Sequence, residues 1–208
     1  MLSFFKDYKV FAIVFGVISI IIIAIIYNTL NVYQPLPIYQ PTMVSTELVD
    51  STIQHKKKYH KIANFSLTNQ KGKTITQNTY KDKIYVADFF FTTCQTICPI
   101  MTDHMVEIQK EIIDDPDVML LSHSVTPEID NVAQLKRYAE KKGVNAKKWN
   151  LVTGDKKEIY KLARKSYLAV KDNGDGGPFD MVHTENFMLI DKKRQIRGFY
   201  DGTNAEDI

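Results

Sequence analysis

The chain has 208 residues, of which 44% are hydrophobic and 25% are charged, and its formal net charge is +3. This length and composition are those of a globular protein with one core and an appendage. Because basic residues are mixed with acidic ones, the composition gives no indication of a nucleic-acid-binding protein. The one dense basic run, His55–Lys58, is interpreted as a solvated linker rather than a contact with lipid or nucleic acid.

The N-terminal part contains an uncharged apolar run at residues 10–27, VFAIVFGVISIIIIAIIY. As a helix, a run of this length covers most of a hydrocarbon core of roughly 30 Å. It is longer than the apolar region of a cleaved signal peptide, and no small-residue cleavage site follows it. It also has no cysteine near its end, which a lipoprotein anchor would need. The pattern therefore predicts a single uncleaved transmembrane helix.

The distribution of cations predicts the orientation of this helix. Lys6 and Lys9 precede the apolar run, and the next lysine or arginine is Lys56. By the positive-inside rule, residues 1–9 should stay in the cytoplasm and the rest of the chain should be exported. The chain has no Arg-rich, acid-poor transit segment, so we expect a bacterial inner membrane with the domain facing the periplasm.

The segment after the span, residues 28–61, has three prolines between Pro35 and Pro41. Because proline blocks regular pairing, we expect a stalk that holds the domain off the bilayer. The folded domain should then occupy residues 62–208.

Three strands are expected early in this domain. Residues 65–68 and 74–76 alternate apolar with polar side chains around a turn, which predicts a β-hairpin. Residues 84–91, IYVADFFF, are nearly all apolar, β-branched or aromatic, and they predict a central strand covered on both faces. Residues 118–125 predict the strand that follows.

Three helices are expected among these strands. Pro99 suits the first residue of the first helix. The buried stripe of that helix consists of Met101, Met105, Ile108 and Ile112. Thr126 and Pro127 should open the second helix as N-cap and first residue, and Asp155 should cap the third.

The C-terminal part begins with a glycine-rich loop at residues 173–178 that leads to His183. Residues 186–190 and 195–200 predict a closing pair of strands. Residues 204–208 have the pattern of the first turn of a closing helix that stops short. Strands that alternate with helices and end in a hairpin predict an α/β fold, a three-layer sandwich.

The two cysteines, Cys94 and Cys98, follow the predicted central strand, at the sheet edge where ligands of open α/β proteins bind. The start of the next helix should lower a cysteine pKa and favour the thiolate. Two thiolates suit a soft metal, Cu(I) above all, and a nitrogen ligand would let the site hold Cu(II) as well. A structural disulfide is the alternative, although so short a loop would constrain the unfolded chain only weakly.

Five histidines are candidates for the nitrogen ligand: His55, His60, His104, His123 and His183. The first two fall in the expected stalk. His104 is near the exposed side of the first helix, and His123 lies inside a strand. His183 ends the glycine-rich loop and immediately precedes a strand, which suits a mobile ligand. The pattern favours His183 without deciding among the candidates.

Several segments together resemble the SCO/SenC family: TTCQTICP, SVTPEIDN, WNLVTG, and HTENFMLID with GFYDG, spread over residues 62–201. The resemblance implies a thioredoxin-like fold and a copper site formed by Cys94, Cys98 and His183. It also implies a role in maturing the dinuclear copper centre of cytochrome c oxidase. The expected cofactor is Cu(I) or Cu(II). The expected partners are the copper-centre subunit of the oxidase and an upstream copper donor or thiol reductant.

The chain departs from this family pattern at three positions. Family members often have proline and aspartate after the first cysteine, where this chain has Gln95 and Thr96. They also often have an aspartate at the position of Thr126. These departures remove no ligand, and we expect them to act on loop stiffness, copper affinity or partner choice.

A second resemblance, to thioredoxin, concerns Asp88. Thioredoxin has a buried aspartate six positions before its first active-site cysteine, and Asp88 stands six positions before Cys94. A carboxylate in such an apolar strand would have a raised pKa and could exchange protons with a thiol. The alternative is an aspartate that points to a wet end of the sheet or bonds the backbone.

Three functions agree with these features. The first is a copper metallochaperone, which is not a conventional enzyme because copper transfer consumes no substrate. The second is a thiol–disulfide oxidoreductase that reduces the cysteines of the oxidase copper subunit through Cys94 and Cys98, without need of His183. The third is a redox or copper sensor that signals through a partner.

Overall fold

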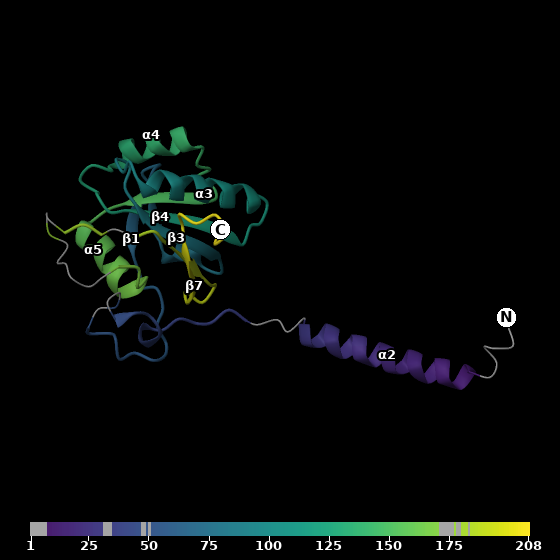
Figure 1. Ribbon diagram of the computed structural model, residues 1–208. Helices are drawn as coiled ribbons and strands as arrows, with labels where there is room; N and C mark the ends of the chain where they lie inside the picture. The colour runs from purple at the N-terminus through teal and green to yellow at the C-terminus, as the bar shows by residue number, and fades with distance from the viewer. Residues whose placement is uncertain are drawn as a thin grey trace. The chain divides into compact units, whose positions relative to one another are not determined.

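The computed structural model describes residues 8–30, 35–46, 49, 51–170, 177, 180–182 and 184–208. The chain divides into two compact units, Met1–Leu36 and Pro37–Ile208. A single helix makes up the described part of the first unit, apart from a few flanking residues, and the second unit contains the sheet (Figure 1).

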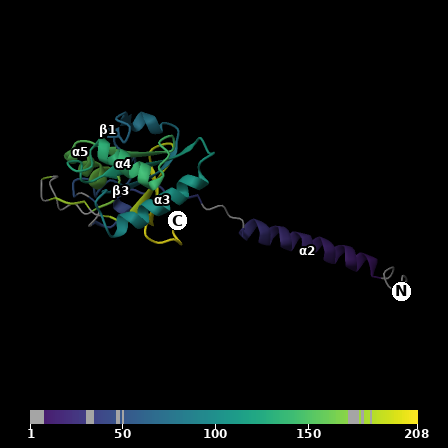
Figure 2. The ribbon, with the colours of Figure 1, turned by 90° about the horizontal axis from the view of Figure 1, so that it is seen from above.

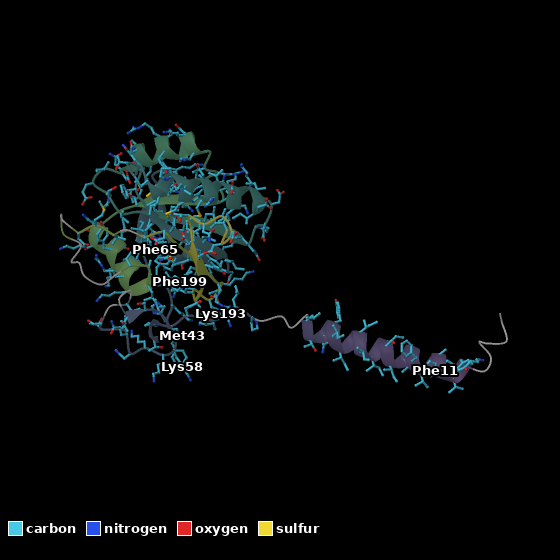
Figure 3. All side chains as sticks on the ribbon, in the orientation of Figure 1. Phe11, Met43, Lys58, Phe65, Lys193 and Phe199 are labelled. Atoms are coloured by element: carbon cyan, nitrogen blue, oxygen red, sulfur yellow. The ribbon has the colours of Figure 1, made fainter. Side chains whose placement is uncertain are left out.

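The helix of the first unit, α2 (Lys9–Leu30), is long and apolar enough to cross a membrane. None of its residues is buried, and apolar side chains such as that of Phe11 project from it (Figure 3). A helix that is apolar all round needs apolar surroundings, a property that membrane anchors share with signal sequences. The span predicted at residues 10–27 is thus helical, and the helix continues to Leu30.

In the second unit, the described strands form one mixed sheet in the order β2-β1-β5-β4-β3-β6-β7. The central strands β5, β4 and β3 are parallel, and β1 and β6 join them in antiparallel orientation. The strands are β1 (Ser66–Asn69), β2 (Thr74–Thr76), β3 (Ile84–Phe90), β4 (Val118–Ser124), β5 (Trp149–Thr153), β6 (Asn186–Ile190) and β7 (Ile196–Asp201). Strand β5 has no counterpart among the predicted strands, because the buried Asn150 interrupts its short apolar pattern.

Helices α3 (Ile97–Glu111) and α4 (Val132–Lys142) cover one face of the sheet, and α5 (Lys156–Lys161) covers the other (Figure 1). Helices α3 and α4 also contact each other (Figure 2). Helix α5 continues into a π-helical turn, η4 (Leu162–Ser166), and two short 3₁₀ helices are η1 (Pro41–Met43) and η3 (Gln77–Tyr80). The arrangement is the predicted three-layer α/β sandwich.

Two hydrophobic cores fill the spaces between the layers. Successive side chains of a strand point to opposite faces of its sheet. Tyr85, Ala87 and Phe89 accordingly belong to the core beneath α5, and Phe90 belongs to the core beneath α3 and α4. Each fully buried large apolar side chain contributes about 1.5–3 kcal/mol, so β3 is held from both faces. Asp88 alternates with Phe89 and therefore lies on the α3 face.

The segment expected as a stalk differs in the structure, because its part from Pro37 onward belongs to the domain. The Tyr39 N–H donates to Ile196 O at 2.9 Å, and Val49 is fully buried in the core beneath α5. His60 is also buried, with Nε2 2.7 Å from Ser166 O. These contacts join residues far apart in sequence, so a proline-rich segment without apolar periodicity still packs as part of the fold.

The first helix begins earlier than predicted. Helix α3 starts at Ile97, so Cys98 lies in its first turn and Pro99 is its third residue rather than its first. Proline is tolerated there because the N–H groups of a first turn have no intrahelical acceptor. Of the expected stripe, Met101 and Met105 are fully buried, and Ile108 and Ile112 are half-buried.

The second helix begins later than predicted, and the expectation for Thr126 and Pro127 is wrong. Helix α4 starts at Val132, and its N-cap is Asn131, whose side chain accepts the Gln134 N–H at 3.0 Å. Residues 126–130 instead form a turn, in which the Asp130 N–H donates to Thr126 O at 2.8 Å. The third cap is confirmed, because the Asp155 carboxylate accepts the Glu158 N–H at 2.8 Å.

The C-terminal residues form turns rather than helix. The Asp207 N–H donates to Asn204 O at 3.2 Å, and the Glu206 N–H donates to the Asn204 side chain at 3.1 Å. The expected helical turn at residues 204–208 is therefore a hydrogen-bonded turn.

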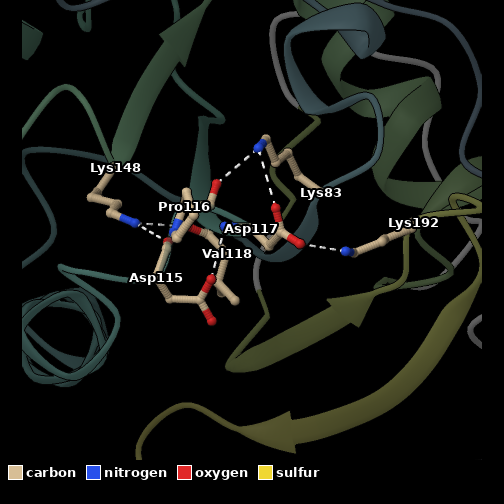
Figure 4. Close-up of polar contacts among 7 residues, drawn as sticks. All are labelled: Lys83, Asp115, Pro116, Asp117, Val118, Lys148 and Lys192. Carbon is tan, nitrogen blue, oxygen red and sulfur yellow. Dashed lines mark hydrogen bonds and ion pairs between the residues drawn. The ribbon is translucent and has the colours of Figure 1, made fainter.

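A polar network ties the amino ends of β3 and β4 to the β6–β7 turn (Figure 4). The Asp117 carboxylate lies 3.5 Å from Lys83 Nζ and 2.5 Å from Lys192 Nζ. Lys83 also donates to Pro116 O at 2.8 Å, and Lys148 donates to Asp115 O. Because Asp117 and Lys192 are exposed, we expect these ion pairs to fix geometry more than to add stability.

Candidate metal centre

The two cysteines lie where β3 passes into α3. Cys94 is half-exposed in the connecting loop, and its N–H donates to Phe91 O at 3.2 Å. Cys98 is buried in the first turn of α3, and both thiols are free. The Cys98 N–H donates to Cys94 Sγ at 3.4 Å. The sulfur of Cys94 is thereby placed against the N-terminus of the helix.

The surroundings of Cys94 favour its thiolate. Partial burial acts to raise the pKa of this thiol, but hydrogen bonds from the Cys98 thiol and from the Thr96 and Cys98 backbone outweigh that effect. The Thr96 hydroxyl, 3.6 Å from the sulfur, adds a further bond. Together these bonds lower the pKa of Cys94 to about 7. Thr96 is one of the departures noted above, and in this chain it supports the thiolate.

The surroundings of Cys98 favour its protonated form. Burial raises the pKa of this thiol, and its hydrogen bond with Cys94 and the negative charges of Cys94 and Asp88 raise it further. A hydrogen bond with the Phe91 backbone opposes them, and the resulting pKa is about 12. Near neutral pH, therefore, Cys94 is partly ionised while Cys98 keeps its proton. This asymmetry makes Cys94 the more nucleophilic thiol.

Asp88 lies on β3 within electrostatic reach of Cys98. It is 2% exposed, so it is not at a wet end of the sheet, although it does bond its own backbone. Burial raises the pKa of its carboxyl to about 7, against an opposing hydrogen bond with Ser122. Its Oδ1 has no hydrogen-bond partner among the residues that the structure describes. A carboxyl of this pKa can take up or release a proton near neutral pH.

Asp130 is a site residue that the sequence analysis missed. It is fully buried in the β4–α4 connection, and its carboxylate accepts hydrogen bonds from three hydroxyl groups and one backbone N–H. Thr92, two residues before Cys94, supplies its hydroxyl at 2.5 Å and its N–H at 3.1 Å. The Ser124 hydroxyl at 2.6 Å and the Thr126 hydroxyl at 3.1 Å complete the set.

Asp130 thus ties the cysteine loop to the end of β4. Gln134 in α4 strengthens the link, since its Nε2 donates to Thr92 Oγ1 at 2.9 Å. Thr126, a departure from the family pattern, acts here as a donor to Asp130, which an aspartate at that position could not do when ionised. The only sequence signal for this arrangement is an Asp that follows two hydroxyl residues, Ser124 and Thr126, within six positions, and that pattern is common in turns.

His183, the expected third ligand, lies outside the residues that the structure describes. The other four histidines are among the described residues. The Nδ1 of His104 lies 2.8 Å from Gly202 O, and the Nδ1 of His123 lies 3.3 Å from Asp88 O. His123 is fully buried, which lowers its pKa to about 4, and it stacks on Phe89 at 4.9 Å between ring centroids.

Within the described part of the chain, no group of three His, Cys, Asp or Glu side chains is arranged to hold a metal ion. Cys94 and Cys98 offer two sulfur donors, without a third such side chain beside them in this part of the chain. Two sulfur donors, one of them ionised near neutral pH, fit a soft ion such as Cu(I).

The chain matches the SCO1/SenC family model over residues 53–208. The SCO1 protein homolog of Bacillus subtilis (strain 168) is 34% identical over 145 residues, which are 69% of this chain and 75% of the relative. A solved structure reported with a disulfide switch belongs to BsSco, a member of the Sco family of cytochrome c oxidase assembly proteins. It is 33% identical, with a TM-score of 0.60, and the match covers 70% of this chain and 85% of that one.

The structure of Bradyrhizobium japonicum ScoI with copper bound is 26% identical, with a TM-score of 0.53. The match covers 70% of this chain and 92% of that one. These likenesses confirm the expected thioredoxin-like SCO fold. The family match covers most of the domain and includes both cysteines, and the chain belongs to the SCO1/SenC family.

Proposed function

We propose that this protein is a copper metallochaperone that binds Cu(I) and Cu(II) through Cys94, Cys98 and His183. In this role it assists maturation of the dinuclear copper centre of cytochrome c oxidase. The observation that carries the proposal is the pair of free thiols where β3 passes into α3, one of which ionises near neutral pH. The copper bound to a related ScoI supports it.

The proposed ligands have different roles in copper binding. Copper is the cargo, and thiolates are the form in which cysteines bind it. Cys94 is ready to bind because hydrogen bonds already lower its pKa to about 7. Cys98, whose pKa is raised, must lose its proton when copper arrives. The imidazole of His183 would add the harder nitrogen ligand that Cu(II) prefers.

Anaerobic titration with Cu(I) and Cu(II) tests the ligand set. Loss of even an outer-shell partner of a metal costs about 10–100-fold in affinity. We therefore expect His183→Ala to weaken Cu(II) binding by on the order of 100-fold and Cu(I) binding much less. The matched control is His55→Ala, an exposed histidine elsewhere on the domain. Equal losses for the two ions, or no loss, would remove His183 from the site.

Oxidation tests the cysteines. A Cys94–Cys98 disulfide leaves no thiolate, so the oxidised protein should bind no copper. Full copper stoichiometry after verified disulfide formation would contradict both ligands.

We also propose that α2 is a single-pass anchor in a bacterial inner membrane, with residues 1–9 in the cytoplasm and the domain in the periplasm. Lys9 at the start of α2, and no cation within the rest of this helix, support that orientation. Protease should digest the domain when it is added to spheroplasts. Protease added to intact cells should release no domain. Protection in spheroplasts would reverse the orientation.

A second candidate function, thiol–disulfide oxidoreductase, is favoured by Asp88 and the unequal thiols. Cys94 thiolate would attack a substrate disulfide, forming a mixed disulfide and releasing one substrate thiolate. Cys98 would give its proton to Asp88 and attack Cys94 Sγ, which releases the second substrate thiol and leaves a Cys94–Cys98 disulfide. An external thiol reductant would then restore the protein. The disulfide switch reported for BsSco supports this reading.

The two functions make different demands on Asp88. If reduction is the task, Asp88→Asn should slow reduction of a disulfide substrate, most visibly near neutral pH, with copper affinity nearly intact. If copper transfer is the task, the same change should leave the reduction rate unchanged. Measuring both quantities on the same variant decides between them.

A further inference from the structure

A basic pocket on the domain takes no part in the copper chemistry. It has a volume of about 650 Å³ and lies beside the C-terminal end of α5 and η4. Its lining includes five cationic side chains and one carboxylate: Lys56, Lys61, Lys161, Lys165, Arg194 and Glu158. We call this surface the basic pocket.

Three of the pocket's cations, Lys61, Lys161 and Arg194, have no carboxylate partner among the described residues. The one carboxylate, of Glu158, makes no ion pair with the described residues, and its Oε1 accepts the Ser66 N–H at 2.9 Å. The Arg194 side chain donates to a neutral group, Asn64 Oδ1, at 2.7 Å. Lys61 and Lys161 make no ion pair with any described residue. By contrast, Lys83 and Lys192 in Figure 4 share the Asp117 carboxylate. The pocket therefore offers positive charge to an anionic partner.

The pocket adjoins the point where the chain enters the domain from α2. Tyr39 N–H donates to Ile196 O, and Ile62 N–H donates to Arg194 O, both at 2.9 Å. The first residues of the domain thus run beside the β6–β7 turn that carries Arg194. Along the sequence, Leu30 ends α2 seven residues before Pro37, the first residue of the domain.

An exposed aromatic residue stands at the rim of the pocket. Tyr59 is 87% exposed, and its φ of 66° is rare for a tyrosine. It follows the basic run His55–Lys58, whose Lys58 lies at the outer edge of the domain (Figure 3). A tyrosine beside lysines is the combination that membrane interfaces favour.

We propose that the basic pocket docks the domain onto the headgroups of anionic phospholipids in the membrane that α2 spans. The inference rests on the proposed anchoring by α2 and is independent of copper. It also has a consequence for the site. The turn that carries Arg194 lies at the amino end of β3, since Ile190 pairs with Tyr85, whereas Cys94 follows the carboxyl end. Docking through the pocket would leave the cysteines free to meet a partner.

The test uses the full-length chain in nanodiscs of phosphatidylcholine, alone or mixed with phosphatidylglycerol, both with brominated acyl chains. Tyr59→Trp supplies a reporter, because the one native tryptophan, Trp149, is 1% exposed. Tryptophan emission should be quenched in the anionic discs far more than in the neutral ones, and high salt should relieve the difference.

The same quenching is then measured in charge-reversed variants that also carry Tyr59→Trp. Each basic residue near an anionic surface contributes about a factor of five in binding. Lys61→Glu with Lys161→Glu should therefore weaken docking by about thirtyfold or more, enough to abolish the anionic quenching. The matched control is Lys110→Glu with Lys141→Glu. These two exposed lysines lie in the last turns of α3 and α4, on the other face of the sheet.

Three results would overturn the proposal. They are equal quenching in neutral and anionic discs, equal loss in the two reversed pairs, and a response to soluble polyglutamate without any response to anionic lipid. The last result would assign the pocket to an acidic protein. Failure of the anchor is separate, because a chain whose α2 does not insert would not enter either kind of disc.

Discussion

Two buried carboxylates flank the cysteine loop, and they are held in opposite ways. Asp130, behind Thr92, accepts hydrogen bonds from three hydroxyls and one N–H. Asp88, on β3, is equally buried, yet its Oδ1 has no partner among the described residues and its pKa is raised to about 7. A buried charge is stable when donors replace the water it has lost, and unstable otherwise. Burial alone therefore does not tell a structural carboxylate from one poised to take a proton.

Because their hydrogen bonding differs, Asp130 and Asp88 affect the thiols in different ways. Asp130 fixes the loop that carries Cys94 and has its oxygens occupied, so its contribution is positional. The negative charge of Asp88 raises the pKa of Cys98, and Asp88 can itself gain or lose a proton near neutral pH. Substitution of each carboxylate tests this contrast.

The largest effect should come from Asp130→Ala. The change strands donors of Thr92, Ser124 and Thr126 that the carboxylate now satisfies. Hydrogen bonds to a charged group contribute about 1.5–3 kcal/mol each and are not additive, so we expect a loss of about 5 kcal/mol in the free energy of unfolding. Urea unfolding of the reduced protein measures it. The control is Asp114→Ala, an exposed aspartate that should change stability by less than about 0.5 kcal/mol. A similarly small effect at Asp130 would refute the positional role.

Asp88→Asn should have a smaller effect on the free energy of unfolding. As the pH rises, this variant should gain stability relative to wild type, whereas Asp130→Ala loses it. The pKa of this carboxyl is raised from 3.8 in the unfolded chain to about 7 in the fold. Between these values the folded protein holds a proton that the unfolded chain has lost, so stability falls as pH increases. The total loss is up to about 4 kcal/mol, and it is complete above the folded pKa.

The asparagine variant has no such titration. Its stability relative to wild type should therefore improve by up to about 4 kcal/mol between pH 4 and pH 8. Unfolding free energies at both pH values measure this difference, and comparison with wild type cancels the titration of other groups. A difference that does not change with pH would mean that Asp88 is ionised in the fold at all these pH values.

These two residues also show what the sequence could and could not predict. The six-residue spacing to Cys94 and the apolar neighbours of Asp88 were enough to raise the hypothesis of a perturbed carboxyl, because both features are local. Asp130 offers only a weak local signal, since its partner Thr92 follows a different strand, β3. Another contact explains the misplaced start of α4, because the hydroxyl of Thr126, the expected cap, donates to Asp130 instead.

Local patterns likewise predicted β3, the β1–β2 hairpin and the Asp155 cap, because each depends on neighbours in sequence. The stalk expected over residues 28–61 was wrong from Pro37 onward, because the packing of that part depends on distant partners, such as Ser166 for His60. The cysteine pair was predictable because the two thiols are only four residues apart in the sequence. The basic pocket was not, because its lysines and arginine come from three separate segments of the chain.

The smallest expected effect is a change in the pH dependence of cysteine alkylation. It tests whether Asp88 acts on the thiols through its charge or by positioning the loop. In the reduced wild type, alkylation of Cys94 should follow a half-point near pH 7, and Cys98 should react only at much higher pH. Asp88→Asn removes one negative charge that raises the pKa of Cys98, although burial dominates that shift. Alkylation of Cys98 should then begin about a few tenths of a pH unit lower, with Cys94 unchanged. Mass mapping of each cysteine after short pulses of iodoacetamide across pH gives both profiles. A shift at Cys94 instead would mean that Asp88 acts on the loop as Asp130 does, and the contrast between the two carboxylates would fail.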